Sequence, residues 1–301
     1  MVVWRIVDGK PGHDNQSLGL VNALKQKKEN LICVDISAHK LRFGLMQLLM
    51  KRFPPGKGLD PPDLILGAGH KTHLSMLCAR RAYGGKTAVI MKPSLPLSCF
   101  DFALIPSHDN PAERKNTLIT EGAMNLVTPT AKHNQARGLV MIGGPSKHYG
   151  WDEQSMLSQL NTVFEKQKNI HWDLTDSPRT PESFSRALAS LDFDNVSFHS
   201  WKLVDRTWLP ERLAICGFAW VSEDSVSMVY ESLTAGTTTG ILQVPVKIPR
   251  KVFDNIEHLE NKNLVVRYHN WVKHGKMPAL SAGLNEADRA ASWILKSLYQ
   301  I

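Results

Sequence analysis

The chain has few cysteines and no long apolar run. Only four cysteines occur among 301 residues (Cys33, Cys78, Cys99 and Cys216), and no two of them form a Cys-x-x-Cys pair. Their scatter argues against a zinc site or a disulfide framework and indicates buried thiols in a reducing compartment. No stretch approaches the roughly 20 apolar residues of a membrane-spanning helix, and no signal-peptide pattern opens the chain. We therefore predict a cytoplasmic protein.

Positive charge is concentrated in one half of the chain. Residues 1–137 carry 19 Lys and Arg against 10 Asp and Glu, a net charge of +9, and the remaining residues carry 17 against 18, a net charge of −1. A basic half either serves solubility or meets an acidic partner, such as a phosphorylated substrate, an anionic membrane or nucleic acid. We predict no nucleic-acid partner, because aromatic residues do not interleave with a basic stripe and no RNA or DNA motif occurs.

Short apolar runs alternate with helical patterns in the first half. The runs are Val2–Val7, Leu31–Ile36, Leu64–Leu66, Thr87–Met91, Phe102–Ile105 and Asn116–Ile119. Helical spacing fills Ser17–Lys27 and Lys71–Tyr83. This alternation predicts a parallel sheet covered on both faces, in which ligands bind beyond the carboxyl ends of the strands. Those ends read DGKPGHDNQ, GAGHKTH, KPS and PSHDN, and all four are rich in polar residues and turn formers.

The alternation restarts after a polar stretch, TPTAKHNQARG. Strands are expected at LVMIGG, IHWDL, NVSFHS, LAICGFAWV and GILQV, with a helix over residues 153–168. The last helix is expected to be capped by Asn285. The predicted organisation is a first α/β domain (1–127), a linker (128–138), a second α/β domain (139–284) and a C-terminal helix (285–301).

A glycine pair follows the first strand of the second half, in MIGGPSKHYG. Gly143 and Gly144 have no Cβ, so their backbone can approach a ligand closely. An ordinary glycine turn is the alternative interpretation.

A strand–loop–helix pattern lies further on, in WVSEDSVSMVYESLTAGTTTGIL. We expect Asp224 or Ser225 to cap the helix and Gly236 to end it. The free N–H groups of its first turn can bind a pyrophosphate, and Glu231, two turns later, can reach a ribose. A capped helix with a solvated glutamate is the alternative.

Together these motifs resemble the GT-B glycosyltransferases. The stretches DGKPGHDNQSLGL, GGPSKHYGW, SPRTP and VSEDSVSMVYESLTAG are similar to the elongated-mitochondria family, which comprises plant mitochondrial-fission proteins and bacterial relatives. The resemblance covers nearly the whole chain. It implies a GT-B fold, with two Rossmann-like α/β/α domains facing across a cleft and a C-terminal helix crossing back to the first domain. A short-chain epimerase is disfavoured, because the first loop lacks its Gly-x-x-Gly-x-x-Gly motif and no tyrosine has a lysine four residues on.

The resemblance also implies a nucleotide-sugar donor bound by the second domain. The residues expected along its phosphates, sugar and ribose are Gly143, Gly144, Ser146, Ser225, Val226, Ser227, Met228 and Glu231. Glu223 and Asp224 place negative charge beside that pyrophosphate, so Asp224 caps the helix, a divalent cation helps, or donor binding has been lost. We favour the cap, and Arg179 is expected to offset the remaining charge.

The acceptor and the catalytic base are expected in the first domain. A base must take the proton of the acceptor hydroxyl, and His13 is the first candidate because an imidazole titrates near neutral pH. Asp14 is the alternative base, or an orienting or capping residue. The remaining acceptor contacts are predicted to be Lys10, Gly12, Asn15, Gln16, His70 and Lys71. A polar surface role is the alternative for each, and the better one for His73 and His108.

No resident metal or cofactor is expected, since GT-B enzymes meet leaving-group charge with helix N-termini and basic side chains. Residues 39–58 place Leu41, Leu45, Leu48, Leu49 and Phe53 at helical spacing among basic residues. This pattern indicates either an ordinary helix packed on the sheet or a peripheral contact with an anionic membrane through residues 41–57.

The predicted function is therefore transfer of a sugar from a nucleoside-diphosphate sugar to an unidentified acceptor. A lipid-linked or phosphorylated acceptor would suit the basic first half, at the inner face of the plasma membrane. A non-catalytic GT-B-like binding or scaffold protein is the alternative, because a fold does not settle function.

Overall fold

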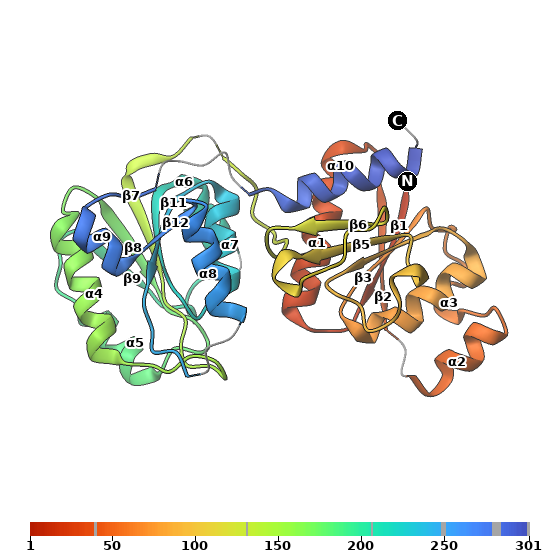
Figure 1. Cartoon of the computed structure of the whole chain (residues 1–301), viewed down its shortest axis with the longest axis horizontal. Coiled ribbons are helices and arrows are strands. Elements are labelled where there is room, and N and C mark those ends of the chain that lie inside the picture. Colours follow the sequence, from red (N-terminus) through yellow and green to blue (C-terminus); the bar gives the residue numbers. More distant parts are fainter. Residues whose placement is uncertain (39–40, 131, 206, 248–250, 279–283, 300–301) are drawn as a thin grey trace. The chain divides into compact units, whose positions relative to one another are not determined.

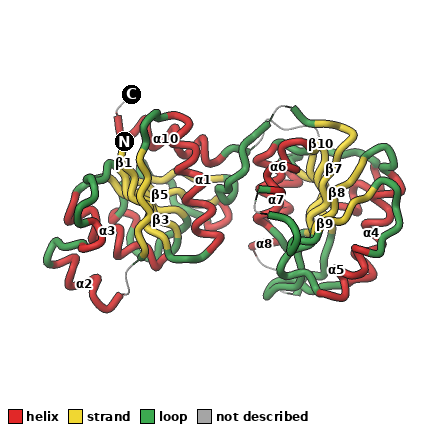
Figure 2. The backbone as a smooth tube through the Cα atoms, turned by 180° about the vertical axis from the view of Figure 1, so that it is seen from behind, coloured by secondary structure: helices red, strands yellow, loops and turns green. Residues whose placement is uncertain are grey.

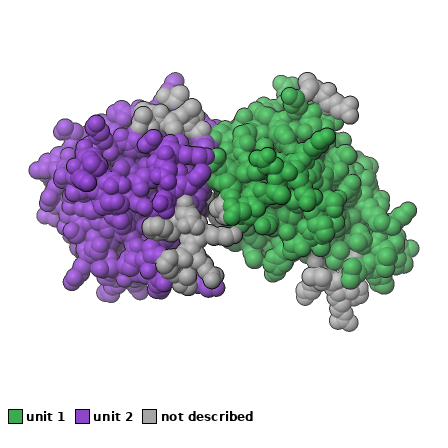
Figure 3. Space-filling view, viewed as in Figure 1, with its two compact units in different colours: residues 1–126, 285–301 green, residues 127–284 purple. Residues whose placement is uncertain are grey.

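The computed structural model describes residues 1–38, 41–130, 132–205, 207–247, 251–278 and 284–299, without the side chains of residues 41–44, 108 and 251–254. The chain forms two compact units, residues 1–126 with 285–301 and residues 127–284 (Figure 3). Each unit holds one six-stranded sheet with helices on both faces, so the predicted α/β class is confirmed (Figures 1 and 2).

The sheet of the first unit is parallel throughout, in the order β2-β1-β3-β4-β5-β6. Its strands are β1 (Val2–Val7), β2 (Ile32–Ser37), β3 (Leu64–Ala68), β4 (Lys86–Ile90), β5 (Phe102–Pro106) and β6 (Thr117–Thr120). Each coincides within two residues, at both ends, with an apolar run of the sequence. Strand β1 pairs with both β2 and β3, so the segments that leave β1 and β3 start side by side.

Helices cover both faces of this sheet. They are α1 (Pro11–Lys27), α2 (Leu41–Leu49), α3 (His73–Tyr83) and α10 (Glu286–Tyr299), with short 3₁₀ turns η1 (Pro54–Gly56), η2 (His70–Thr72), η3 (Leu97–Cys99) and η4 (Ser107–Asp109). Leu24 of α1 and Ile294 of α10 share one buried cluster, while Met76 of α3 packs with Trp4 and Phe53 on the other face.

The C-terminal helix returns to the first unit, as expected. Asn285 caps it, because its Oδ1 accepts the Asp288 N–H at 3.0 Å. Asp288 also forms an ion pair with Lys27 of α1 at 2.6 Å.

Helix α1 begins six residues earlier than predicted. Pro11 occupies its first turn, where the missing N–H costs no hydrogen bond and the fixed φ suits a helix. The buried guanidinium of Arg5 donates to the Asp14 carbonyl at 3.1 Å and pairs with Asp35, which holds this first turn against the sheet. The segment from Pro11 to Gln16 is therefore helix rather than loop.

The sheet of the second unit is also parallel, in the order β9-β8-β7-β10-β11-β12. Its strands are β7 (Asn134–Met141), β8 (His171–Thr175), β9 (Val196–His199), β10 (Cys216–Ser222), β11 (Thr238–Leu242) and β12 (Val265–Arg267). Residues 134–138, placed in a linker by the sequence, are thus the start of β7. Their side chains are mostly exposed because β7 pairs with β8 only from Arg137 onward, which explains the misleading polarity.

Six helices flank the second sheet. They are α4 (Glu153–Lys166), α5 (Glu182–Ala189), α6 (Trp208–Ile215), α7 (Val226–Ala235), α8 (Lys251–Asn261) and α9 (Tyr268–His274). Phe164, Phe184 and Trp271 bury α4, α5 and α9 on one face, and Leu213 and Leu233 bury α6 and α7 on the other. The sequence analysis did not predict helix α6. This helix includes the first three residues of LAICGFAWV, which was expected to be a strand throughout.

Candidate functional site

The strand order of the first unit creates a crevice at the carboxyl ends of β1 and β3. Helix α1 follows β1 on one face of the sheet, and α3 follows β3 on the other. Neighbouring strands whose connections diverge in this way leave a crevice between them, which is the usual ligand position in open α/β sheets.

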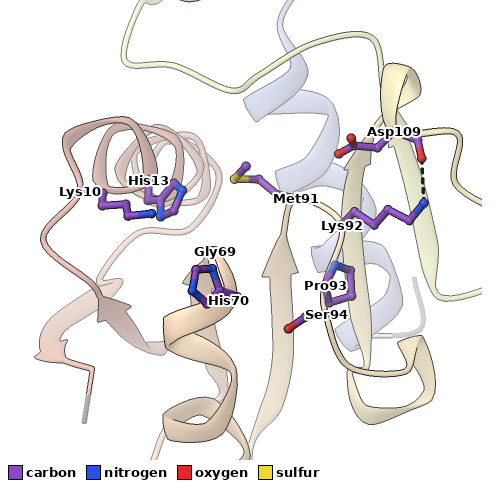
Figure 4. A pocket seen from close by; sticks show the side chains of 9 residues that line it. All are labelled: Lys10, His13, Gly69, His70, Met91, Lys92, Pro93, Ser94 and Asp109. Carbon is purple, nitrogen blue, oxygen red and sulfur yellow. Dashed lines mark hydrogen bonds between the residues drawn. The ribbon is translucent and has the colours of Figure 1, made fainter. Parts of the chain in front are cut away.

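A cavity of about 530 Å³ lies at this crevice (Figure 4). Residues that follow β1, β3, β4 and β5 line it: Lys10, His13, Gly69, His70, Met91, Lys92, Pro93, Ser94 and Asp109. Three predicted residues, Lys10, His13 and His70, are therefore brought together.

His13 is held by a carboxylate that the sequence analysis missed. Its Nδ1 lies 3.0 Å from Oδ2 of Asp8, whose side chain is fully buried. Burial alone would raise the pKa of Asp8, but hydrogen bonds from the Lys10 N–H and from His13 outweigh it and hold that pKa below its usual value. Asp8 is thus an ionised partner that orients the imidazole, the role the sequence analysis considered for Asp14. The signal was the acidic residue that directly follows the first strand.

Gly69 leaves room for the imidazole. Its φ of +82° is a left-handed conformation that favours glycine. A Cβ at this position would overlap the His13 ring. Gly69 therefore leaves space for the His13 imidazole, the candidate base, rather than for a ligand.

Other predicted acceptor residues lie outside the cavity lining. These are Gly12, Asp14, Asn15, Gln16 and Lys71. In a helix, successive side chains point in different directions, so of this first turn only His13 lines the cavity. Contacts of the other residues with an acceptor stay a prediction. The side chain of His108 lies outside the described part of the chain.

His73 is buried, with only 3% of its surface exposed, so the polar surface role expected for it is wrong. Burial, helped by the charge of His70, lowers the pKa of His73 to about 4, so its ring is neutral near pH 7. Its Nδ1 lies 3.3 Å from Oγ of Ser94, a cavity residue that the sequence analysis did not single out.

The second unit has its own diverging strands, β7 and β10. Helix α4 follows β7 on one face of the sheet, and α7 follows β10 on the other. The glycine pair and the start of α7 meet at this point. The sequence analysis located this edge correctly but misjudged what its residues contact.

Gly143 and Gly144 make room for protein atoms. A Cβ on Gly143 would overlap the Asp224 carboxylate, and one on Gly144 would overlap the Arg179 carbonyl. Their N–H groups are also occupied, donating to Ser222 Oγ at 2.7 Å and Asp224 Oδ2 at 2.9 Å. The expectation that this backbone lies open to the donor phosphates is therefore wrong in this conformation.

Asp224 does not cap α7. Its buried carboxylate accepts the Gly144 N–H and pairs with Arg179 at 2.7 Å, because these donors lie directly across the strand ends. The Arg179 guanidinium also donates to the Gly144 carbonyl at 2.9 Å. Arg179 thus neutralises Asp224, as expected of its charge, while its side chain stays 40% exposed. Ser146 likewise closes its own loop, since its Oγ accepts the His148 and Tyr149 N–H groups.

Glu223, beside Asp224, is also buried and compensated. Burial raises its pKa, while Arg267, 3.8 Å away, opposes that shift. Arg179 and Arg267 therefore oppose the negative charge of Asp224 and Glu223 within the protein itself.

The start of α7 retains donors. The Ser225 N–H is occupied by the Ser222 carbonyl at 3.1 Å, and the Ser225 side chain makes no capping hydrogen bond. The N–H groups of Val226, Ser227 and Met228 lie in the first turn, where the helix itself supplies no acceptors. Glu231 lies further along the same helix, and burial raises its pKa to about 7. Gly236 ends the helix in a left-handed conformation, as predicted.

Two parallel α/β units, each with diverging strands at its carboxyl edge, define the GT-B class of fold. Residues 11–298 match the family described as mitochondrial fission ELM1, and the chain belongs to that family. An uncharacterized protein of Rickettsia prowazekii is 25% identical over 298 residues, which covers 81% of this chain and 84% of the relative.

Solved structures support the same fold. A UDP-GlcNAc 2-epimerase from Neisseria meningitidis, bound to UDP-GlcNAc, has a TM-score of 0.59 at 12% identity, over 100% of both chains. The glycotransferase of kitacinnamycin has a TM-score of 0.52 at 12% identity, over 99% of both chains. Among the described helices, none has the length and apolar character needed to cross a membrane.

Proposed function

We propose that this protein transfers a sugar from a nucleoside-diphosphate sugar to a hydroxyl group of an acceptor. The observation that carries the proposal is the Asp8–His13 pair in the cavity of the first unit. A buried carboxylate that orients a histidine at a ligand-sized cavity is the arrangement that general base catalysis needs. The donor is assigned to the second unit and the acceptor to the first.

His13 acts as the base. The Asp8 carboxylate accepts the Nδ1–H, which leaves Nε2 unprotonated and ready to take the proton of the acceptor hydroxyl. The acceptor oxygen then bonds to the anomeric carbon of the donor sugar. The bond between that carbon and the donor phosphate breaks, and its electron pair leaves with the nucleoside diphosphate.

The start of α7 receives the leaving group. Its first-turn N–H groups and the helix dipole stabilise the developing negative charge. The pairing of Asp224 with Arg179 removes the repulsion that a free carboxylate would exert there. Glu231, on the same helix, accepts hydrogen bonds from the ribose hydroxyls in this proposal. Transfer requires both units to hold their substrates at once.

Nucleotide titration tests the donor half of the proposal. The UDP-GlcNAc bound to the Neisseria epimerase makes this sugar nucleotide the first probe, followed by ADP-, GDP- and dTDP-sugars. Glu231→Ala should weaken binding by roughly 1–3 kcal/mol, the value of a hydrogen bond to a charged group. Glu257→Ala, an exposed carboxylate on α8, is the matched control and should change nothing. Failure of every nucleotide to bind would favour the scaffold alternative.

We also propose that α2 places the first unit on an anionic membrane. Four apolar side chains, three on α2 and one directly after it, are more than half exposed: Leu45 (65%), Met46 (55%), Leu49 (78%) and Met50 (52%). Exposed Lys51 and Arg52 follow directly. An apolar helix face with a basic end suits insertion among anionic headgroups, beside which a lipid-linked acceptor would be found.

A further inference from the structure

The turn that follows β4 has a strained backbone. Met91 has a φ of +73°, a conformation that non-glycine residues rarely adopt. Its N–H donates to the Leu104 carbonyl at 2.9 Å, which pins the turn to the end of β5. Strain of this kind persists where surrounding structure enforces it, commonly at functional sites. Here it turns residues 92–94 toward the cavity, which all three line (Figure 4).

Lys92 brings an uncompensated charge to that cavity. Its Nζ donates to the backbone carbonyl of Asp109 at 3.0 Å, and that acceptor carries no formal charge. Among the described residues, neither Lys92 nor Lys10 forms an ion pair. Asp109 contributes the one carboxylate in the lining, against two lysines, and the Asp8 carboxylate beside the lining is engaged by His13. The start of the 17-residue helix α1 adds partial positive charge. The cavity therefore favours an anion.

Ser94 adds an oriented hydroxyl. Its Oγ lies 3.3 Å from Nδ1 of the buried His73. Burial keeps that imidazole uncharged near neutral pH. In the tautomer that carries its proton on Nδ1, the ring donates to Ser94 and the serine proton is free to reach a ligand.

We propose, resting on the glycosyl transfer above, that the acceptor carries a phosphate group and that Lys92 and Ser94 bind it beside Lys10. The Lys92 ammonium and the Ser94 hydroxyl donate to the phosphate oxygens, while His13 faces the hydroxyl that receives the sugar. A phosphorylated sugar and a lipid phosphate present the same group to these side chains.

Calorimetric titration of the whole protein with glucose 1-phosphate, and with glucose as the uncharged match, tests this assignment. Glucose 1-phosphate should bind at least tenfold more tightly than glucose. Lys92→Gln should weaken its binding about tenfold or more, and Ser94→Ala about three- to tenfold. Lys115→Gln removes an exposed charge from the same unit outside the cavity and should change binding less than twofold.

A second arm identifies the source of the phosphate. Vesicles of phosphatidylcholine with and without phosphatidic acid replace the sugar phosphate, and Lys92→Gln is compared with the parent protein. Lys92-dependent binding to phosphatidic acid alone, without binding of glucose 1-phosphate, supports the proposal and assigns the phosphate to a lipid. If neither probe shows a dependence on Lys92 beyond that of Lys115, the proposal is overturned.

The two proposals fail separately. Intact binding of UDP-GlcNAc without Lys92-dependent phosphate binding rejects the phosphate site and leaves the donor site standing. Lys92-dependent phosphate binding in a protein that binds no nucleotide leaves the phosphate site standing and rejects glycosyl transfer.

Discussion

The two units share a plan but use their carboxyl edges differently. Both have a six-stranded parallel sheet with diverging connections, β1 and β3 in one and β7 and β10 in the other. In the first unit the edge opens into a cavity whose lysines form no ion pair in the described structure. In the second, the conspicuous polar groups bind one another, as Asp224 does with Gly144 and Arg179.

The difference assigns distinct tasks to the two edges. Paired groups hold one another in place and fix the strand ends, so in the proposed function the second edge offers a fixed helix terminus to the leaving group. Lysines that form no ion pair among the described residues, and a histidine oriented by a buried carboxylate, suit the contact with a reacting acceptor. The first edge is therefore the reactive one in the proposed function.

Removing the imidazole should give the largest effect. We expect His13→Ala to lower turnover about 10²–10⁴-fold, the usual contribution of a general base, with nucleotide affinity unchanged. The release of UDP from UDP-GlcNAc, with water or a phosphorylated sugar as acceptor, measures it. His70→Ala alters another cavity imidazole and should cost far less. If the variant loses nucleotide binding but keeps its turnover at saturating substrate, the donor binds in the first unit. The assignment of donor and acceptor to the two units would then be reversed.

Asp8→Asn tests the orientation of the His13 ring while leaving the ring itself in place. The variant keeps the size of the side chain but loses the carboxylate that fixes the His13 tautomer. Turnover should fall by less than in His13→Ala, with nucleotide affinity unchanged, because the imidazole stays in place but its tautomer is no longer fixed. Turnover equal to that of the parent protein would contradict the pairing.

The glycine pair probes the rigid edge. Gly143→Ala places a methyl group against the Asp224 carboxylate, so we expect a loss of roughly 1–3 kcal/mol of stability from overpacking. Thermal unfolding measures it, with Gly12→Ala as the control, since a Cβ there meets open space. Equal melting temperatures would mean that this edge is loose, which contradicts the comparison.

The sequence predicted the strands well because buried parallel strands are continuous apolar runs, and all six runs of the first half became strands. It predicted the sites less well for a physical reason. Gly143 and Gly144 were expected to admit a ligand, but the space they leave holds Asp224 and the Arg179 carbonyl. Which atom occupies the space beside a glycine depends on tertiary contacts that local sequence does not encode.

The same dependence on tertiary contacts explains why Lys92 and Ser94 were missed. Both follow β4, and only the strand order brings them to the cavity that His13 lines, whereas Asp8 precedes His13 by five residues on the same connection. The spacing of leucines likewise identified the helix at residues 41–49 but not which leucine it buries. Leu48 packs into the core of the first unit, whereas Leu45 and Leu49 are exposed.

Those leucines give the next prediction. Leu45→Ser with Leu49→Ser should lower binding to phosphatidylglycerol vesicles about tenfold or more, because two inserted side chains are lost. Cosedimentation measures it, and the melting temperature should stay the same. Leu48→Ala is the matched control, which should destabilise the fold by roughly 1–2 kcal/mol and leave vesicle binding intact. Unfolding of the double variant would show that α2 is an ordinary core helix.

The smallest expected effect is a pH dependence specific to the second unit. Burial raises the pKa of Glu231 to about 7, so the carboxylate that would accept the ribose hydroxyls forms only above that pH. Affinity for UDP-GlcNAc should therefore rise roughly tenfold between pH 6 and pH 8. This probe is chosen because its pyrophosphate has no group that titrates near neutral pH. Stability should change in the opposite direction, because the unfolded chain loses this proton first, near its ordinary pKa. The stabilisation from the raised pKa is complete below the unfolded value and is lost as the pH rises through about 7. Glu231→Gln should flatten both dependences, while His13→Gln should leave the affinity curve unchanged. An affinity curve that follows His13 instead would move nucleotide recognition to the first unit.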